Sequence, residues 1–332
     1  MRNYVFGILA YNQEQYIVET LESIKFQKIQ YGADFDVSLI ITDDASRDNT
    51  VAIANDWIAK NRAYFANVHV IANEKNQGIV PNFCKIVQMV DIDNEYLKII
   101  AGDDLIGYKN VFAEYDTLTD KKLKTYFRVE LCEGKISYRE KYLIEFYYHM
   151  THNTGRAYNL KYFKRGRYMH TPSTLYTKQL FVNANVERNL EGYRLYEDDP
   201  MWYSMIKNEK DLEIEFVPQG MVLYRMHNQS VSNVPNPMFR KDQKRLREQY
   251  LAETKGFEKL YLWIRMRSSK LPMYLNLSLY IDKLVNMKRK AACRKDPGYQ
   301  QFKENIEKQI KEEQKFYDSI METIAKDSVN KK

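Results

Sequence analysis

Hydrophobic and polar positions in the first hundred residues alternate between two periods. Four short apolar runs have the length and composition of buried strands, and they span about 3–10, 37–42, 67–71 and 95–100. Between them, apolar residues recur every three or four positions, which indicates amphipathic helices at about 14–28, through Val51 to Ile58, and from near Pro81. This alternation of strands and helices predicts an α/β domain with a parallel or mixed sheet flanked by helices.

The remaining chain divides by the same criteria. Residues 105–165 are rich in Tyr, Lys and Glu without a clear period, so we interpret them as an insertion or subdomain. Short strand-like segments return over 166–239, including Met221 to Met226, and the pattern becomes helical from about 240. We therefore expect one domain over 1–239 and a mostly helical C-terminal extension over 240–332.

Composition excludes several classes of protein. The 332 residues are 44% hydrophobic and 29% charged, with 12 Gly, 8 Pro and no low-complexity stretch, so an ordered globular chain is expected. The longest charge-free apolar runs, 3–13 and 271–281, are about half of the ~20 residues that cross a bilayer. The N-terminus lacks the features of a secretory signal, and the sequence thus predicts a cytoplasmic location.

The net charge of +7 is concentrated in the C-terminal region, where residues 240–332 hold 23 Lys and Arg against 13 Asp and Glu. Residues 260–295 are strongly basic and also contain an apolar stripe at helical spacing, formed by Met273, Leu277, Tyr280, Ile281 and Leu284. Two interpretations stay open for this region. It either lies peripherally on an anionic membrane face, or packs on the catalytic domain or a second subunit with its basic residues in solvent. The acidic residues after 300 argue against nucleic acid as a partner.

Polar clusters follow each of the four predicted strands at its carboxyl end, and they are Tyr11-Asn12, Asp43-Asp44, the stretch from Asn73 to Gly78, and Asp103-Asp104. In an open α/β sheet the loops at this edge converge on one crevice. One Asp-rich turn is ordinarily a solvated loop, but four in succession favour a binding cleft.

The chemistry of this cleft cannot rest on a glycine-rich phosphate loop, because the sequence has neither the P-loop nor the dinucleotide fingerprint. Three separated cysteines without a CxxC pair also give no thiolate zinc site. Adjacent carboxylates at a strand end, Asp103 and Asp104, can instead hold a divalent cation that binds phosphates. His227 could supply a further metal ligand from a separate segment, and Arg225 could meet phosphate.

A second acidic cluster, Glu197-Asp198-Asp199-Pro200, offers a proton acceptor. Asp199 before Pro200 is a normal helix start. The helix start does not account for Glu197 and Asp198. Both are therefore candidate proton acceptors, because a carboxylate at the edge of a pocket can take a proton from an incoming hydroxyl.

Six segments, in this order, resemble the bacterial family 2 glycosyltransferases of the GT-A fold. They are ILAYNQEQYIVETLESI at 8–24, LIITDDASRDNT at 39–50, NEKNQGIVPNF at 73–83, IIAGDDLI at 99–106, YEDDPMW at 196–202 and YRMHNQSVS at 224–232. The resemblance spans about 1–235, and it makes 105–165 an acceptor-side subdomain or insertion of a GT-A domain with a Rossmann-like mixed sheet.

The resemblance implies roles for individual residues. Tyr11 and Asp44 would contact the nucleotide base, with Asp43 and the loop from Asn76 to Gly78 beside them. Asp103 and Asp104 correspond to the end of the DxD motif that contacts ribose and binds Mn²⁺ or Mg²⁺, although Ala101-Gly102 leaves out its first carboxylate. Asp198 corresponds to the general base, with Glu197 next to it, and His227 to the late histidine of the metal shell.

The activity implied is inverting transfer of a hexose from a nucleotide-diphosphate sugar, with UDP favoured, to a hydroxyl of a glycan, glycoprotein or lipid-linked acceptor. An alternative is a non-catalytic nucleotide-sugar binding module that recruits partners through its basic tail. The retained Asp198 favours the enzyme.

Overall fold

The computed structural model describes residues 3–91, 95–138, 143–151, 160, 163–164, 169–227, 236–268 and 277–329. The strands are β1 (Asn3–Ala10), β2 (Asp36–Asp43), β3 (Val68–Ala72), β4 (Glu95–Ala101), β5 (Leu105–Ile106), β6 (Lys122–Cys132), β7 (Lys135–Tyr138), β8 (Thr174–Leu175) and β9 (Glu213–Arg225). The α-helices are α1 (Ile17–Tyr31), α2 (Thr50–Asn61), α3 (Ile79–Met89), α4 (Val111–Tyr115), α5 (Leu143–Thr151), α7 (Lys178–Asn183), α8 (Val186–Leu190), α9 (Asp198–Asn208), α10 (Pro237–Glu253), α11 (Gly256–Ser268), α12 (Leu277–Lys295) and α13 (Pro297–Val329). Two 3₁₀ turns, η1 (Arg62–Tyr64) and η2 (Thr171–Ser173), complete the described elements.

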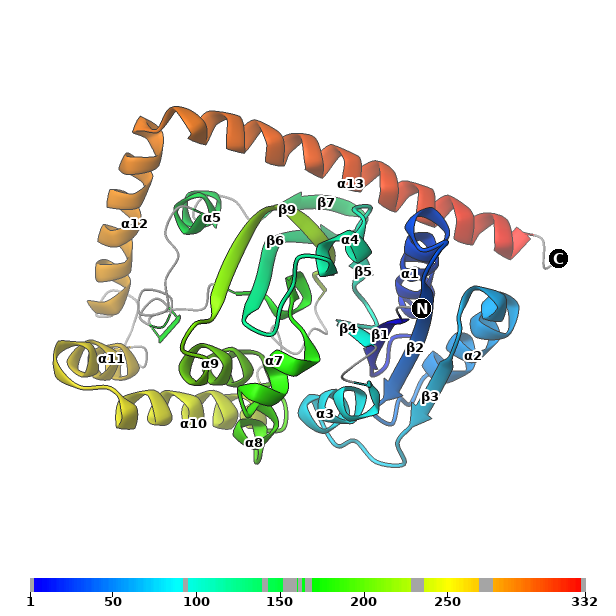
Figure 1. Cartoon of the computed structure of the whole chain (residues 1–332), viewed down its shortest axis with the longest axis horizontal. Coiled ribbons are helices and arrows are strands. Elements are labelled where there is room, and N and C mark those ends of the chain that lie inside the picture. Colours follow the sequence, from blue (N-terminus) through cyan, green and yellow to red (C-terminus); the bar gives the residue numbers. More distant parts are fainter. Residues whose placement is uncertain are drawn as a thin grey trace.

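The first sheet contains the four strands that the sequence predicts, paired in parallel in the order β3-β2-β1-β4. Side chains of β1 alternate between its faces, so that Tyr4, Phe6 and Ile8 belong to the core beneath α1 and α2, and Val5 to the core beneath α3. Gly7 allows α3 to approach closely, because a Cβ there would lie 2.5 Å from Cγ2 of Ile86. The result is a sheet with helices on both faces (Figure 1).

Helix starts differ slightly from the sequence predictions. α1 begins at Ile17 instead of near 14, because the preceding residues form a turn in which the N–H of Tyr16 donates to Gln13 O. Asn49 occupies the N-cap position of α2, but its side chain makes no capping hydrogen bond and donates to Glu14 Oε2 instead. Asp48 Oδ1 accepts from the N–H of Thr50 at 3.0 Å. Asp48 is therefore the residue that satisfies the start of α2.

A second sheet has the order β5-β9-β6-β7, with β8 paired to β6. β6 and β9 pair in parallel, and β9 pairs antiparallel with β5, which directly follows Asp104. The sequence predicted a strand only from Met221 to Met226, but β9 starts at Glu213. The register between β6 and β9 shifts around Pro218, and such an irregularity is where a strand tolerates proline.

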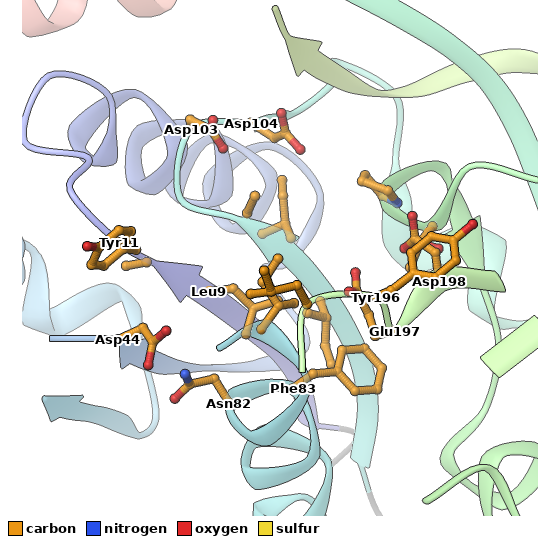
Figure 2. A pocket seen from close by; sticks show the side chains of 18 of the residues that line it. Leu9, Tyr11, Asp44, Asn82, Phe83, Asp103, Asp104, Tyr196, Glu197 and Asp198 are labelled. Carbon is orange, nitrogen blue, oxygen red and sulfur yellow. The ribbon is translucent and has the colours of Figure 1, made fainter. Parts of the chain in front are cut away.

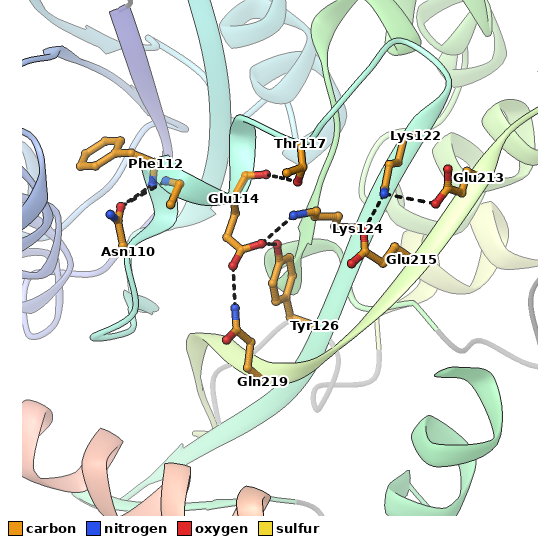
Figure 3. Close-up of polar contacts among 11 residues, drawn as sticks. Asn110, Phe112, Glu114, Thr117, Lys122, Lys124, Tyr126, Glu213, Glu215 and Gln219 are labelled. Carbon is orange, nitrogen blue, oxygen red and sulfur yellow. Dashed lines mark hydrogen bonds and ion pairs between the residues drawn. The ribbon is translucent and has the colours of Figure 1, made fainter. Parts of the chain in front are cut away.

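Residues 105–138 form part of this second sheet, and polar contacts attach them to it (Figure 3). Glu114 Oε2 accepts from Lys124 Nζ at 2.8 Å and from the hydroxyl of Tyr126 at 2.7 Å, while its Oε1 accepts from Gln219 Nε2 at 2.8 Å. Because Gln219 belongs to β9, this carboxylate connects α4 to both long strands. The proposal that 105–165 is an insertion or acceptor-side subdomain remains a prediction, and 139–142, 152–159 and 165–168 lie outside the described residues.

The C-terminal region is helical, as predicted. α13 extends along one edge of the molecule and contacts α1, β7 and β9 (Figure 1). Its Phe316, Tyr317 and Ile320 share a buried cluster with Leu105 of β5 and Leu223 of β9. A domain boundary at 239 stays a prediction. In the part of the chain that the structure describes, none of the helices has the length and apolar character of a membrane span.

Candidate active site

A cavity of about 630 Å³ opens at the carboxyl ends of β1, β2 and β4. In Figure 2, Tyr11 and Asp44 lie at the left of the cavity, Asp103 and Asp104 at the top and Asp198 at the right. The predicted site residues that line it are Tyr11, Asp44, Asn76, Asp103, Asp104, Glu197, Asp198 and His227. The structure thus gathers residues from six separate sequence segments into one pocket.

Asp44 shapes the loop that closes one end of the cavity. Its carboxylate accepts hydrogen bonds from the backbone N–H groups of Gln77, at 2.7 Å, and Gly78, at 2.9 Å. Asn76 Nδ2 donates to the backbone oxygen of Asp44 at 3.2 Å. The Asp44 side chain is buried and holds the backbone of 76–78 in place, so loop shape and pocket wall depend on the same carboxylate.

Two of the predicted donor-binding residues lie behind this wall, since neither is among the residues that line the described pocket. Asp43 is buried and its Oδ2 accepts from the N–H of Ser46 at 2.8 Å, which fixes the turn after β2. Gly78 has a φ of 96°, and a Cβ there would lie 2.5 Å from the backbone oxygen of Arg194. Both residues set the course of the backbone around Asp44.

The acidic pair sits at the junction of the two sheets, between β4 and β5. His227 Nε2 lies 2.8 Å from Asp103 Oδ2, and both side chains are on the cavity wall. Asp104 is almost fully buried, and its Oδ1 accepts from the backbone N–H of Arg225 at 2.8 Å. Burial, and secondarily the charge of Asp103, raises the pKa of Asp104.

Asp103, Asp104 and His227 are the residues from which the sequence predicts a metal site, and all three line the cavity. Among the described residues, no group of three or more His, Cys, Asp or Glu side chains could hold an ion by itself. Asp104 Oδ2 is buried without a hydrogen-bond partner in the same part of the chain, which leaves an acceptor oxygen at the junction. The residues therefore fit an incomplete hard-ion site, to which a ligand such as a diphosphate would have to add oxygens.

The guanidinium of Arg225 lies in a buried network. Nη2 pairs with Glu19 Oε2, Nε donates to the backbone oxygen of Asp103 at 2.8 Å, and the group lies 4.5 Å from the ring centre of Tyr16. Arg225 is not among the residues that line the described pocket. These contacts favour a positioning role behind the acidic pair over the phosphate contact that the sequence suggested.

Glu197 and Asp198 lie at the start of α9. α9 begins at Asp198, two residues before Pro200, the predicted first helical position, and Glu197 in place of Asp199 is its N-cap residue. Asp199 instead accepts a hydrogen bond from the hydroxyl of Tyr196, which attaches its carboxylate to the adjoining loop. Both Glu197 and Asp198 line the cavity, so the structure leaves two carboxylates as candidate bases.

Sequence reasoning missed the wall that the second sheet contributes. Arg128 of β6 has its guanidinium 4.5 Å from the ring centre of Tyr224, and His170 packs edge-on against the same ring. All three line the cavity, together with Arg194, whose Nη2 donates to Asn76 O at 2.9 Å. The irregular pattern of 105–165 and an isolated His170 gave no signal for this wall.

Comparisons with known proteins agree with this geometry. Residues 6–114 match the family model described as Glycosyl transferase family 2. The chain is 27% identical over 233 residues to an uncharacterized protein of Mycobacterium tuberculosis, Rv1520, covering 66% of this chain and 57% of that protein. The chain thus spans under three fifths of the length of such relatives. The dTDP-rhamnosyl transferase RfbG of Shigella flexneri is 33% identical over 102 residues, 30% of this chain and 32% of that protein.

Two solved structures share the fold. TarS 1–349 of S. aureus has 15% sequence identity and a TM-score of 0.51, covering 97% of this chain and 92% of the other. GalNAc-T7 with UDP, GalNAc and Mn²⁺ has 13% identity and a TM-score of 0.51, covering 84% and 54%. The chain therefore has the GT-A fold, and its residues 6–114 match the model of glycosyl transferase family 2.

Proposed function

We propose that this protein transfers a sugar from a nucleotide-diphosphate sugar to an acceptor hydroxyl with inversion at the anomeric carbon. The single observation that carries the proposal is that Asp103, Asp104 and Asp198, from separate segments of the chain, line the same cavity. A diphosphate held near the acidic pair and a hydroxyl near Asp198 would then have the sugar between them. The match of 6–114 to family 2 supports the same reaction class.

The donor lies along the edge of the first sheet in this proposal. Tyr11, Asp44 and Asn76 surround the end of the cavity that accommodates the base, and Asp103 lies at the ribose and diphosphate. UDP is the nucleotide we favour, since the family resemblance implies it and the structural neighbour GalNAc-T7 was solved with UDP. The relative named a dTDP-rhamnosyl transferase makes a dTDP-sugar the alternative donor.

Mn²⁺ or Mg²⁺ is the cofactor we infer, with Asp103, Asp104 and His227 as its protein ligands. A divalent ion bound there would supply positive charge for the departing diphosphate. The chain itself contributes the ligand oxygens and the backbone contact that holds Asp104. Arg225 acts from behind by fixing the backbone of Asp103 through its Nε.

Asp198 is the base in this mechanism. Its carboxylate accepts the proton of the acceptor hydroxyl while that oxygen forms a bond to the anomeric carbon, and the bond from this carbon to the diphosphate oxygen breaks. The electron pair of the broken bond leaves with the diphosphate, and attack from the opposite face inverts the configuration. Glu197, which lines the same wall, is the alternative base.

A panel of UDP- and dTDP-sugars, incubated with Mn²⁺, Mg²⁺ or a chelator, tests the proposal by release of free nucleoside diphosphate. We expect metal-dependent release from one class of donor. Donor binding without release, in the presence of candidate glycan, glycoprotein and lipid-linked acceptors, would instead indicate the non-catalytic nucleotide-sugar binding module. Absence of both binding and release would reject the donor class.

A further inference from the structure

The outer face of α12 carries an apolar stripe that is exposed. The stripe consists of Tyr280, Leu284, Met287 and Ala291, at the i, i+4, i+7 and i+11 positions of a single helix face. Leu284 is 59% exposed and Met287 58%, so packing against the rest of the chain does not account for them. Of the stripe predicted from the sequence, Tyr280 and Leu284 are exposed, and packing on a second subunit stays a prediction. Met273 and the side chains of Leu277 and Ile281 lie outside the described residues.

Basic side chains border the α12 stripe on both sides. At about 100° per residue, Lys283 and Arg294 fall on one side of the stripe and Lys288 and Lys295 on the other. All four are exposed, and none of the described exposed side chains of α12 is acidic. A line of apolar groups between two rows of cations is the arrangement of a helix that lies in a membrane interface.

The opposite face of α12 is already occupied. Cys293 is buried, its thiol lying 3.6 Å from Glu145 O of α5, and α12 contacts both α5 and α13. These contacts determine which face of α12 is packed against the protein and which face is exposed to solvent. The helix itself lies at an outer edge of the molecule (Figure 1), and the exposed stripe is on the side away from these contacts.

α11, which contacts α12, adds a second exposed apolar group. Phe257 is 91% exposed, and Leu260 and Trp263 are exposed on the following turns. The guanidinium of Arg267 lies 4.4 Å from the ring centre of Trp263, which places a cation beside the indole. Trp and Phe with neighbouring Arg are typical of side chains that insert at the headgroup level.

We propose that the exposed faces of α11 and α12 bind the protein to an anionic lipid bilayer. The apolar side chains enter the headgroup boundary, and Lys283, Lys288, Arg294 and Lys295 meet lipid phosphates. A second copy of the chain fits this face less well, because a symmetric contact would bring rows of like charge together. A polyanion such as nucleic acid would leave the central apolar stripe without a partner.

Flotation of the full chain with vesicles tests the proposal without requiring catalysis. The vesicles are phosphatidylcholine alone or mixed with phosphatidylglycerol, each at low and high salt. We expect binding to the anionic vesicles that weakens with salt. Leu284→Glu/Met287→Glu should abolish it, whereas Ile29→Glu, at an exposed apolar position of α1, should not. Lys283→Glu/Lys288→Glu should lower partitioning by on the order of tenfold or more, since each cation contributes roughly a fivefold factor.

Tryptophan fluorescence gives an independent measure of insertion. Trp57 and Trp202 are buried, so quenching by brominated lipid reports on Trp263. The Lys121→Glu/Lys315→Glu variant has the same change in net charge as Lys283→Glu/Lys288→Glu, but away from α11 and α12, and it should bind vesicles like the wild type. Circular dichroism of each variant establishes that it is folded. Absent binding, binding indifferent to lipid charge and salt, or self-association lost in the Leu284→Glu/Met287→Glu variant without vesicle binding would each overturn the proposal.

Discussion

The backbone N–H of Arg225 donates a hydrogen bond to Asp104 Oδ1 at 2.8 Å, although 121 positions separate the two residues in the chain. The same arginine pairs with Glu19 through its guanidinium and holds the backbone oxygen of Asp103 through Nε. The last residue of β9 therefore connects α1 to both members of the acidic pair. The proposed diphosphate site depends on this long-range contact for its geometry.

Arg225→Ala should lower the free energy of unfolding by about 3–5 kcal/mol, because it leaves Glu19 buried without its counter-ion. Urea denaturation measures this, and Lys244→Ala is the matched control, since its ion pair with Glu248 is exposed and should contribute less than about 1 kcal/mol. In a double-mutant cycle, Glu19→Gln together with Arg225→Met should cost less than the two single changes added. Additive losses would mean that the two side chains are not coupled.

Asp198→Asn should abolish sugar transfer and leave donor affinity close to that of the wild type, because the proposed base acts on the acceptor. Product formation and calorimetric donor titration measure the two effects separately. Glu191→Gln, at an exposed carboxylate that directly follows α8, is the control and should be fully active. Transfer by the Asp198→Asn variant at a near wild-type rate would move the role of base to Glu197.

Donor binding should need a divalent cation, since the pocket holds Asp103, Asp104 and His227 but the sequence has no glycine-rich phosphate loop. Titration of UDP with Mn²⁺ and then with a chelator measures the dependence. Asp103→Asn should weaken affinity in Mn²⁺ by roughly tenfold or more and change it little in chelator. Equal affinities with and without metal would remove the ion from the mechanism.

Gly78→Ala should destabilise the protein by about 1–3 kcal/mol. The added Cβ would lie 2.5 Å from Arg194 O, at a φ of 96° that disfavours any side chain. Gly256→Ala is the matched control, since Gly256 also has a positive φ but nothing lies within 4 Å of the added atom. If both variants lose the same stability in urea, backbone strain alone explains the effect and the contact with Arg194 is unimportant.

Stability should fall between about pH 5 and pH 8 because of Glu313 on α13. Burial raises the pKa of this carboxyl to about 8 from an ordinary 4.5, even though Oε2 accepts from the N–H of Tyr108 at 3.2 Å and Lys109 lies nearby. The folded protein therefore keeps a proton that the unfolded chain releases. The stability linked to this proton is complete below pH 4.5 and is lost as the pH rises through about 8.

Glu313→Gln should remove this slope, which denaturant midpoints at about pH 6 and about pH 8 would show. Glu312→Gln is its neighbour on the exposed side of α13 and should leave the slope unchanged. An unaltered slope in the Glu313→Gln variant would assign the pH dependence to other groups.

The sequence was most informative where a pattern is local. The strands of the first sheet were identified as short apolar runs, because both faces of these strands are buried against a neighbour, and the helices between them from their period of 3.6. The carboxyl ends of parallel strands meet at one edge, so Tyr11, Asp44 and Asp103 could be assigned to one cleft.

Long-range contacts escaped the same reasoning. Nothing in the spacing of residues 105–138 shows that β6 pairs with β9, or that Arg128 and Tyr224 form a wall of the cavity. The sequence suggested a phosphate contact for Arg225, because a basic residue near a cleft is expected to face that cleft. Its pairing with Glu19 depends on a helix some two hundred residues earlier, and no local pattern records such a pairing.

By itself the sequence determined the elements, the edge of the sheet that carries the site and the residue types available there, because these follow from periodicity and strand direction. Only the tertiary structure decided which of those residues face the cavity and which hold its backbone. Asp44 and Asp198 line it, whereas Asp43 and Arg225 lie behind it. The physical reason is that a side chain takes its role from its nearest partners, and those partners come from distant segments that only the packed fold brings together.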